Sequence, residues 1–168
     1  VESHPEEMLA NLNHASDWLQ GRRMPEIMAR TDLDALCLVV PVLSTTFASV
    51  PRMFADIGRE GIGWLLIDEA GQALPQQAAG AIWRAKRAVV VGDPNQLEPV
   101  IAVPATVEGA LARHYDDVDQ RWWPSETSAQ RLADQTMDIG TWLPGAGQQK
   151  LWVGCPLRVH RRCDYPMF

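Results

Sequence analysis

The sequence of 168 residues lacks the features that mark membrane proteins and disulfide-rich secreted proteins. It contains no run of about 18 apolar residues, so no segment is expected to span a bilayer. Its three cysteines, Cys37, Cys155 and Cys163, lack the CxxC or Cys/His spacing of a zinc site and form an odd, scattered set. Free cysteines are typical of a reducing compartment, so these absences predict a cytoplasmic protein without membrane contact.

Positive charge is also scarce. Lys and Arg number 15 against 21 Asp and Glu, which gives a formal net charge of −6 and no overall basic field for nucleic acid. The basic residues cluster locally, at Arg84, Lys86 and Arg87 and again at Arg158, Arg161 and Arg162. Phosphate binding by the chain alone is therefore expected to be weak and lost at modest salt.

Apolar runs of strand length alternate with segments of helical periodicity. Strands are predicted at 36–43 (LCLVVPVL), 63–67, 88–91 and 150–154 (KLWVG). Helices are predicted at 5–20, 25–34, 72–87, 107–114 and 126–137, with a further helix after the STT of 44–46. Continuous apolar strands between helices are typical of an α/β fold with a mostly parallel sheet flanked by helices, in which function lies at the carboxyl ends of the strands.

Two adjacent acids, Asp68 and Glu69, directly follow the apolar strand in LLIDEAGQA. Neighbouring carboxylates repel each other unless a cation lies between them or their environments differ. One carboxylate could hold a Mg²⁺ that bridges nucleotide phosphates while the other activates the attacking water. Two solvated acids at the end of a strand remain an equally good interpretation of this pair alone.

The next predicted strand repeats the arrangement in VVVGDPNQLEPV, where Gly92, Asp93 and Gln96 follow the apolar run. Gly92 permits a tight turn and Asp93-Pro94 is strong turn chemistry, so a turn without a ligand is the simpler interpretation of this segment by itself. A neutral amide such as Gln96 could instead hydrogen-bond a phosphate oxygen or the attacking water. Polar groups at two neighbouring strand ends favour a site over coincidence.

Three separated blocks, LLIDEAGQA, VVVGDPNQLEPV and VGCPLRVHRR, resemble motifs II, III and IV of superfamily 1 helicases, in that order. They are most similar to the 1B branch that contains the nonsense-mediated-decay helicase and senataxin-like enzymes, and PVLSTTFASV resembles motif Ic. The resemblance implies a partial RecA-like P-loop NTPase domain. It divides the chain into a helical N-terminal segment (1–35), a sheet core with motifs Ic, II and III (36–108), a helical or loop insertion (109–150), and motif IV with the start of a linker to a second motor domain (151–168).

The resemblance also implies roles for individual residues. Asp68 would hold Mg²⁺, Glu69 would be the catalytic base, and Gln72 would tie the acidic box to neighbouring motifs. Gln96 would sense the γ-phosphate of ATP, and Arg158 would stabilise transition-state charge as an arginine finger does. Gly92 and Asp93 would belong to the nucleotide site. Ser44, Thr45 and Thr46 could contact a nucleic-acid backbone or cap the following helix, and capping is the favoured interpretation. Trp122 and Trp123 could stack on bases, but packing in a core or interface is favoured.

The chain departs from the family pattern in two places. It has no GxxxxGK[ST] loop, and Leu157 stands where a tyrosine is expected. The resemblance therefore implies a fragment of an ATP-dependent helicase or translocase whose phosphate-binding loop lies upstream of residue 1, and which is inactive alone. The alternatives are a non-enzymatic interaction module on a helicase scaffold or another P-loop ATPase. Implied partners are single-stranded DNA or RNA and a second RecA-like domain. Without the strand that carries this loop, the outer edge of strand 88–91 would be unpaired, so either KLWVG moves into the gap or two chains associate there.

Overall fold

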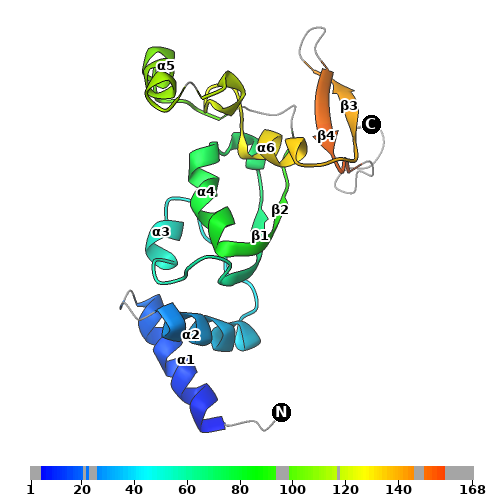
Figure 1. The fold of residues 1–168 in the computed structure, drawn as a ribbon. Coiled ribbons are helices and arrows are strands. Elements are labelled where there is room, and N and C mark those ends of the chain that lie inside the picture. The colour runs from blue at the N-terminus through cyan, green and yellow to red at the C-terminus, as the bar shows by residue number, and fades with distance from the viewer. Residues whose placement is uncertain are drawn as a thin grey trace. The chain divides into compact units, whose positions relative to one another are not determined.

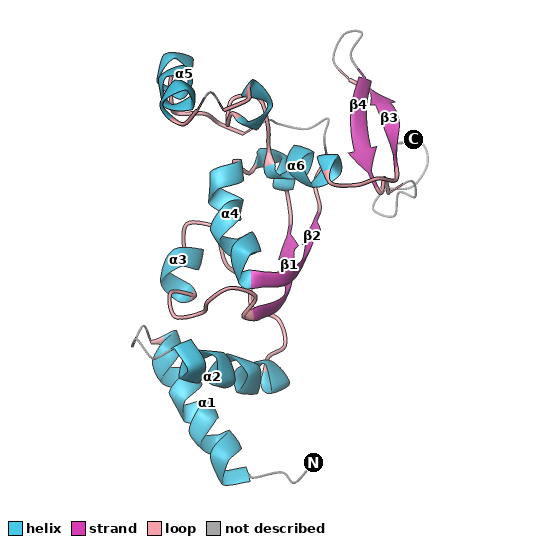
Figure 2. Cartoon of the chain, in the orientation of Figure 1, coloured by secondary structure: helices cyan, strands magenta, loops and turns pink. Residues whose placement is uncertain are grey.

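The computed structural model describes residues 5–20, 22, 26–93, 99–116, 118–145 and 150–157. Figure 1 shows the chain in sequence colours, and Figure 2 distinguishes its helices and strands. The chain divides into two compact units. Unit 1 comprises residues 1–66 and 76–89, and unit 2 comprises residues 67–75 and 90–168. None of the helices within the described ranges is both long and apolar enough to cross a membrane.

Unit 1 begins with a pair of helices, α1 (Pro5–Leu19) and α2 (Glu26–Val39), which pack against each other. A proline at the first position and two glutamates in the first turn favour the start of α1. The core of the unit combines this pair with the short helix α3 (Val50–Met53) and helix α4 (Pro75–Arg84). Its buried members are Trp18, Ala29, Leu33, Val50, Phe54, Ile57 and Ala81.

A parallel pair of strands follows the helices, β1 (Ile62–Ile67) and β2 (Ala85–Val90), with α4 connecting them. Pro75 occupies the first helical position of α4, where its missing N–H costs nothing. Helix α4 passes into β2 without a loop, so Ala85, Lys86 and Arg87 are strand residues rather than the helical residues predicted from the sequence. The Arg84 guanidinium fixes this junction, because its Nε donates to the Phe54 carbonyl at 2.9 Å.

The strand predicted at 36–43 is wrong. Residues up to Val39 belong to α2, and residues 40–46 form no regular structure. Leu33, Leu36 and Cys37 have the i, i+3, i+4 spacing of one helix face, and all three pack in the core of unit 1. Pro41 has no N–H and disfavours helical geometry at the residue before it, so the helix ends there. A short apolar run cannot be assigned to strand or helix by its pattern alone.

A buried carboxylate lies between α1 and α2. Asp32 is 2% exposed, and its Oδ1 lies 3.7 Å from the Nδ1 of His14. Burial raises the pKa of the Asp32 carboxyl above its ordinary value of 3.8, and His14 offsets this only in part. Its second oxygen has no hydrogen-bond partner among the described residues. Ionisation of the buried Asp32 carboxyl therefore destabilises the folded state locally.

Unit 2 contains the 3-10 turns η1 (Ala70–Gln72) and η2 (Gln120–Trp122), helices α5 (Ala105–His114) and α6 (Ala129–Gln135), and strands β3 (Gly140–Pro144) and β4 (Lys150–Gly154). Ser128 caps α6, because its side-chain oxygen accepts from the N–H of Arg131 at 3.2 Å. Helix α6 packs against both β4 and η1. It is thus the central element of the unit.

The predicted strand KLWVG exists as β4, but its partner differs from the expected one. It pairs antiparallel with β3, in a register that places Trp142 opposite Trp152, and not with the edge of β2. A hairpin partner that is close in sequence costs less loop-closure entropy than a distant edge. No strand within the described ranges covers the outer edge of β2.

Candidate functional site

The carboxyl ends of β1 and β2 are joined by backbone hydrogen bonds within unit 2. The N–H of Val91 donates to the Ile67 carbonyl at 2.8 Å, and the N–H of Ala70 donates to the Val91 carbonyl at 2.9 Å. Ile67 and Ala70 are buried, at 3% and 0% exposed. The two strand ends are neighbours, as the sequence predicted, and the turn that carries the paired acids is anchored on both sides to Val91.

The two acids themselves are exposed on this anchored turn. Asp68 Oδ1 accepts from the N–H of Glu69 at 3.0 Å. Glu69 has φ 54° and ψ 37°, a left-handed conformation that is uncommon for a residue other than glycine, asparagine or aspartate. Gln72 donates from Nε2 to Glu69 Oε2 in a long hydrogen bond of 3.4 Å. Backbone strain of this kind persists only where surrounding contacts hold it, and it is often found at functional sites.

Gly92 lies where two backbone segments approach too closely for a side chain. A Cβ at this position would lie 2.8 Å from the nitrogen of Gly71 and 3.0 Å from the nitrogen of Ala70. A Cβ on Gly71 would in turn lie 3.1 Å from the carbonyl oxygen of Asp93. The two glycines therefore allow the D-E-A-G-Q turn and the G-D turn to pack against each other through their backbones.

Helix α6 supports the same turn through a residue that the sequence did not reveal. The N–H of Ala129 donates to the Ala73 carbonyl at 2.9 Å. Gln130 is 6% exposed, and its Oε1 lies 3.1 Å from the position of a Cβ on Gly92. This oxygen has no hydrogen-bond partner among the described residues, so a buried acceptor faces the junction of the two turns. Gln130 is 38 residues beyond Gly92, and only the tertiary fold brings them together.

Asp134, one turn further along α6, forms hydrogen bonds both to Gln130 and to the β3–β4 hairpin. Its carboxylate is 4% exposed, and Oδ1 accepts from the Gln130 amide at 3.2 Å and from the N–H of Gly154 at 3.0 Å. Its backbone carbonyl accepts from the indole N–H of Trp152 at 3.1 Å. The acidic turn, α6 and β4 are thereby connected by hydrogen bonds between buried and partly buried groups, which are costly to break.

The structure brings together five of the predicted site residues: Asp68, Glu69, Gln72, Gly92 and Asp93. Gln96 and Arg158 lie outside the described residues, so their predicted roles stay predictions. Ser44, Thr45 and Thr46 are exposed loop residues of unit 1. The expectation that they cap the next helix is wrong, because the residue before α3 is Ser49, and Thr46 instead donates its hydroxyl to Ser49 Oγ at 3.4 Å.

The carboxylates at this site fit a magnesium ion in their chemistry. No group of three or more His, Cys, Asp or Glu side chains within the described ranges is arranged to hold a metal ion. Mg²⁺ is commonly held by one or two carboxylates, with phosphate and water oxygens completing its shell. Asp68 is an exposed carboxylate with one oxygen engaged by a single N–H, which leaves acceptor capacity for such an ion.

Comparison with known proteins gives one family match. Residues 35–103 match a family model described as an AAA domain, a family that occurs in superfamily 1 helicases. The matched region is less than half of the chain and contains β1, the acidic turn, α4, β2 and the Gly92 turn. No curated protein and no solved structure matches the chain. The match indicates the class of P-loop NTPases, a class that generally uses ATP and Mg²⁺.

Proposed function

We propose that this chain is part of an ATP-dependent helicase or translocase of superfamily 1B, and that it supplies the acidic box of the first RecA-like motor domain. The observation that carries the proposal is the geometry of Glu69. Its exposed carboxylate stands on a residue in left-handed conformation, on a turn hydrogen-bonded to the end of the neighbouring strand. The AAA domain match over residues 35–103 supports the class.

Asp68 and Glu69 divide the work of hydrolysis in this proposal. Asp68 binds the ion, and Mg²⁺ supplies neutralisation of phosphate charge when it is bound. Glu69 accepts the proton of the attacking water, and Gln72 orients that carboxylate through the bond to Oε2. The buried backbone of Ile67 and Ala70 holds both acids in place before the substrate arrives.

The remaining residues of the proposed site act on phosphate groups. Gly92 and Asp93 form the turn that faces the acidic box across the strand ends. Gln96 senses the γ-phosphate, and Arg158 neutralises charge on the transferred group. Single-stranded DNA or RNA is the proposed track, with Ser44, Thr45 and Thr46 as candidate backbone contacts through their exposed hydroxyls.

The chain has no GxxxxGK[ST] sequence, so it lacks the backbone cradle and lysine that hold nucleotide phosphates in P-loop enzymes. We therefore propose that residues 1–168 alone do not turn over ATP, and that the loop comes from a longer polypeptide. The test compares ATP hydrolysis by the longer protein, by its Glu69→Gln variant and by residues 1–168. Turnover by the longer protein that needs Glu69 supports the proposal, and turnover that does not need it rejects it.

A specific observation favours a second candidate function, that of a non-enzymatic interaction module. Unit 1 exposes several large apolar side chains at the end of α2, on the segment after it and on β1, among them Leu38, Val42, Trp64 and Leu66. The outer edge of β2 is also without a strand within the described ranges. Exposed apolar residues and an uncovered strand edge are each typical of a surface that another segment covers. In the proposed enzyme, this partner is the rest of the motor domain, and self-association replaces it in the isolated chain.

A further inference from the structure

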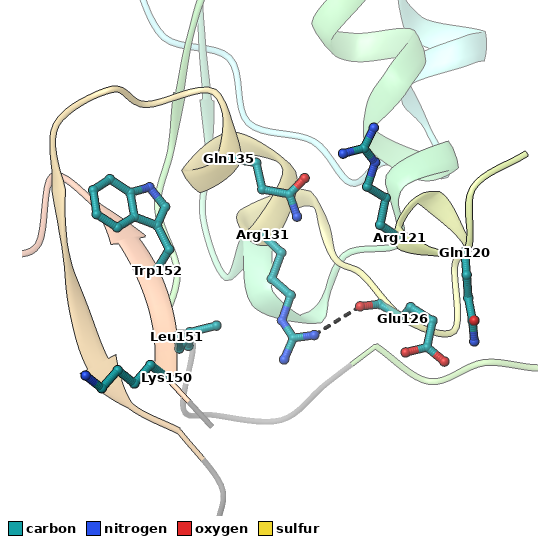
Figure 3. A pocket seen from close by; sticks show the side chains of 8 residues that line it. All are labelled: Gln120, Arg121, Glu126, Arg131, Gln135, Lys150, Leu151 and Trp152. Carbon is teal, nitrogen blue, oxygen red and sulfur yellow. Dashed lines mark hydrogen bonds between the residues drawn. The ribbon is translucent and has the colours of Figure 1, made fainter. Parts of the chain in front are cut away.

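A basic pocket lies within unit 2, outside the region that matches the AAA domain family. Its volume is about 510 Å³, within the range of small-molecule sites. Figure 3 shows Arg131 and Gln135 of α6 between the residues of β4 on one side and those of the η2 region on the other. The lining residues are Gln120, Arg121, Glu126, Arg131, Gln135, Lys150, Leu151 and Trp152. Three separate elements thus contribute to one concave surface.

The lining carries a surplus of positive charge in an acidic chain. Arg121, Arg131 and Lys150 are its cations, and Glu126 is its one carboxylate. Arg131 donates from its guanidinium to the backbone carbonyl of Glu126 at 3.0 Å, a bond that orients the guanidinium (Figure 3). Lys150 is exposed and has no ion-pair partner among the described residues.

The third cation, Arg121, does have an acidic neighbour. Its Nε lies 3.3 Å from Asp119 Oδ2, with both side chains more than half exposed. An exposed ion pair of this kind is weak and yields readily to a competing anion. The pocket therefore retains a net attraction for phosphate, even though the chain as a whole carries a charge of −6.

Indole rings accompany the cations on the same elements. Trp152 lines the pocket and meets Trp142 edge-on, with ring centroids 5.3 Å apart. Trp142 is 60% exposed, and Trp122 is 48% exposed beneath the Arg121 guanidinium at 5.3 Å. Trp122 is therefore not packed in a core, whereas its packing in an interface stays a prediction. Exposed indoles beside cations form the combination that binds single strands, because cations hold the phosphates and rings stack on the bases.

From this arrangement we infer that the pocket lined by Arg121, Arg131, Lys150 and Trp152 is a binding site for single-stranded nucleic acid. The cations contact the phosphodiester backbone, the indoles of the hairpin stack on unpaired bases, and the Gln120 and Gln135 amides reach base edges or sugars. The inference deepens the proposed function by locating a strand-binding site outside the family-matched region. It can fail separately, because binding is measured without ATP.

The test is a fluorescence-anisotropy titration of residues 1–168 with a labelled oligothymidylate, repeated from about 50 to 200 mM salt, where phosphate contacts change affinity strongly. Lys150→Gln is expected to weaken binding and to lower the slope of log K against log salt by about 0.7, the value for one phosphate contact on a single strand. Arg30→Gln is the control, since it removes one positive charge from an exposed residue of α2 in unit 1, away from both basic clusters of the sequence. Equal losses of affinity in both variants, or no binding of the oligothymidylate at low salt, would overturn the proposed binding site.

Two further measurements decide what the pocket recognises. Glu126→Gln removes the carboxylate of the lining without touching the carbonyl that holds Arg131, so it is expected to tighten binding. An abasic oligonucleotide of equal length is expected to bind about fivefold more weakly or worse, because it cannot stack. Equal binding of the abasic strand, of duplex or of polyglutamate would show a general polyanion surface or an acidic-peptide site, and would reject the inference.

Discussion

The amide nitrogen of Gly71 lies 2.8 Å from the position that a Cβ atom would occupy on Gly92. Neither backbone can move freely, because Ala70 and Val91 are hydrogen-bonded across the same junction. Gly92→Ala is therefore expected to destabilise unit 2 by about 1–3 kcal/mol, the usual cost of overpacking. Hydrogen exchange of the peptides that contain residues 67–75, together with a denaturant titration, measures the effect.

The control for this prediction is Gly63→Ala in β1. A Cβ on Gly63 meets nothing within 4 Å, and the residue is exposed. This substitution is expected to leave stability unchanged or to raise it by up to about 1 kcal/mol, through lower entropy of the unfolded chain. Similar behaviour of the two variants would contradict the close approach of the two turns.

Asp134→Ala is expected to loosen the hairpin from α6. The substitution removes the acceptor of two N–H donors, and so leaves the buried Gln130 amide and the partly buried Gly154 N–H without this partner. We expect a loss of about 1–3 kcal/mol, with faster hydrogen exchange concentrated at Gly154 and the residues around it. Asp138→Ala removes the same charge from an exposed position and should change neither quantity. Equal exchange at Gly154 in both variants would show that Asp134 does not hold the hairpin.

The Asp32 carboxyl predicts a pH-dependent difference in stability. Because its pKa is raised in the folded state, the folded chain binds more protons than the unfolded chain between the ordinary value of 3.8 and the raised value. Stability from this group is therefore greatest at low pH and falls as the pH rises through that window. Asp32→Asn should stabilise unit 1 more at pH 7 than at pH 3, as measured by paired denaturation curves.

The comparison isolates Asp32 together with its neighbour His14, since the remaining titrating groups are shared by the two proteins. Asp34→Asn is a suitable control, because that residue is exposed on the same helix. A difference between wild type and Asp32→Asn that does not grow with pH would contradict the burial of the charged group.

The uncovered edge of β2 predicts association of the isolated chain. Residues 1–168 are expected to form a dimer in sedimentation equilibrium, and Val89→Lys is expected to shift the chain toward monomer, since lysine on an edge strand discourages pairing. Val89 is 40% exposed, so the substitution is tolerated on the surface. A wild-type chain that stays monomeric at high concentration would contradict the expected self-association.

Local chemistry made parts of the fold predictable from the sequence. The β1 run ends in two acids and the β2 run in Gly92-Asp93, so the meeting of these strand ends followed from the rule for parallel strands. Segment 36–43 could not be assigned, because its apolar run suits a helix as well as a strand until Leu33, Leu36 and Cys37 are seen to share one face.

Long-range contacts were not predictable in the same way. Gln130 approaches Gly92 from 38 residues away, and β4 pairs with β3, which carries only the weak pattern GTWLP. Two of the pocket cations, Arg121 and Lys150, had a faint signal in the runs RWW and KLW, where a basic residue lies within two positions of a tryptophan. Composition alone argued against a nucleic-acid site, because the net charge of −6 does not show the local surplus of positive charge in the pocket.

The proposal of ATP hydrolysis rests most directly on the Glu69 carboxylate. The decisive measurement is the ATP turnover of the proposed longer protein, with Glu69→Gln and Glu60→Gln variants and residues 1–168 in one assay. Glu60→Gln is a demanding control, because Glu60 is also an exposed glutamate with positive φ, at 55°. We expect Glu69→Gln to lower turnover by about two or more orders of magnitude with nucleotide binding retained, a typical loss for a general base. Glu60→Gln should match wild type, and residues 1–168 should stay at background. Normal turnover in the Glu69→Gln protein would contradict the proposed function.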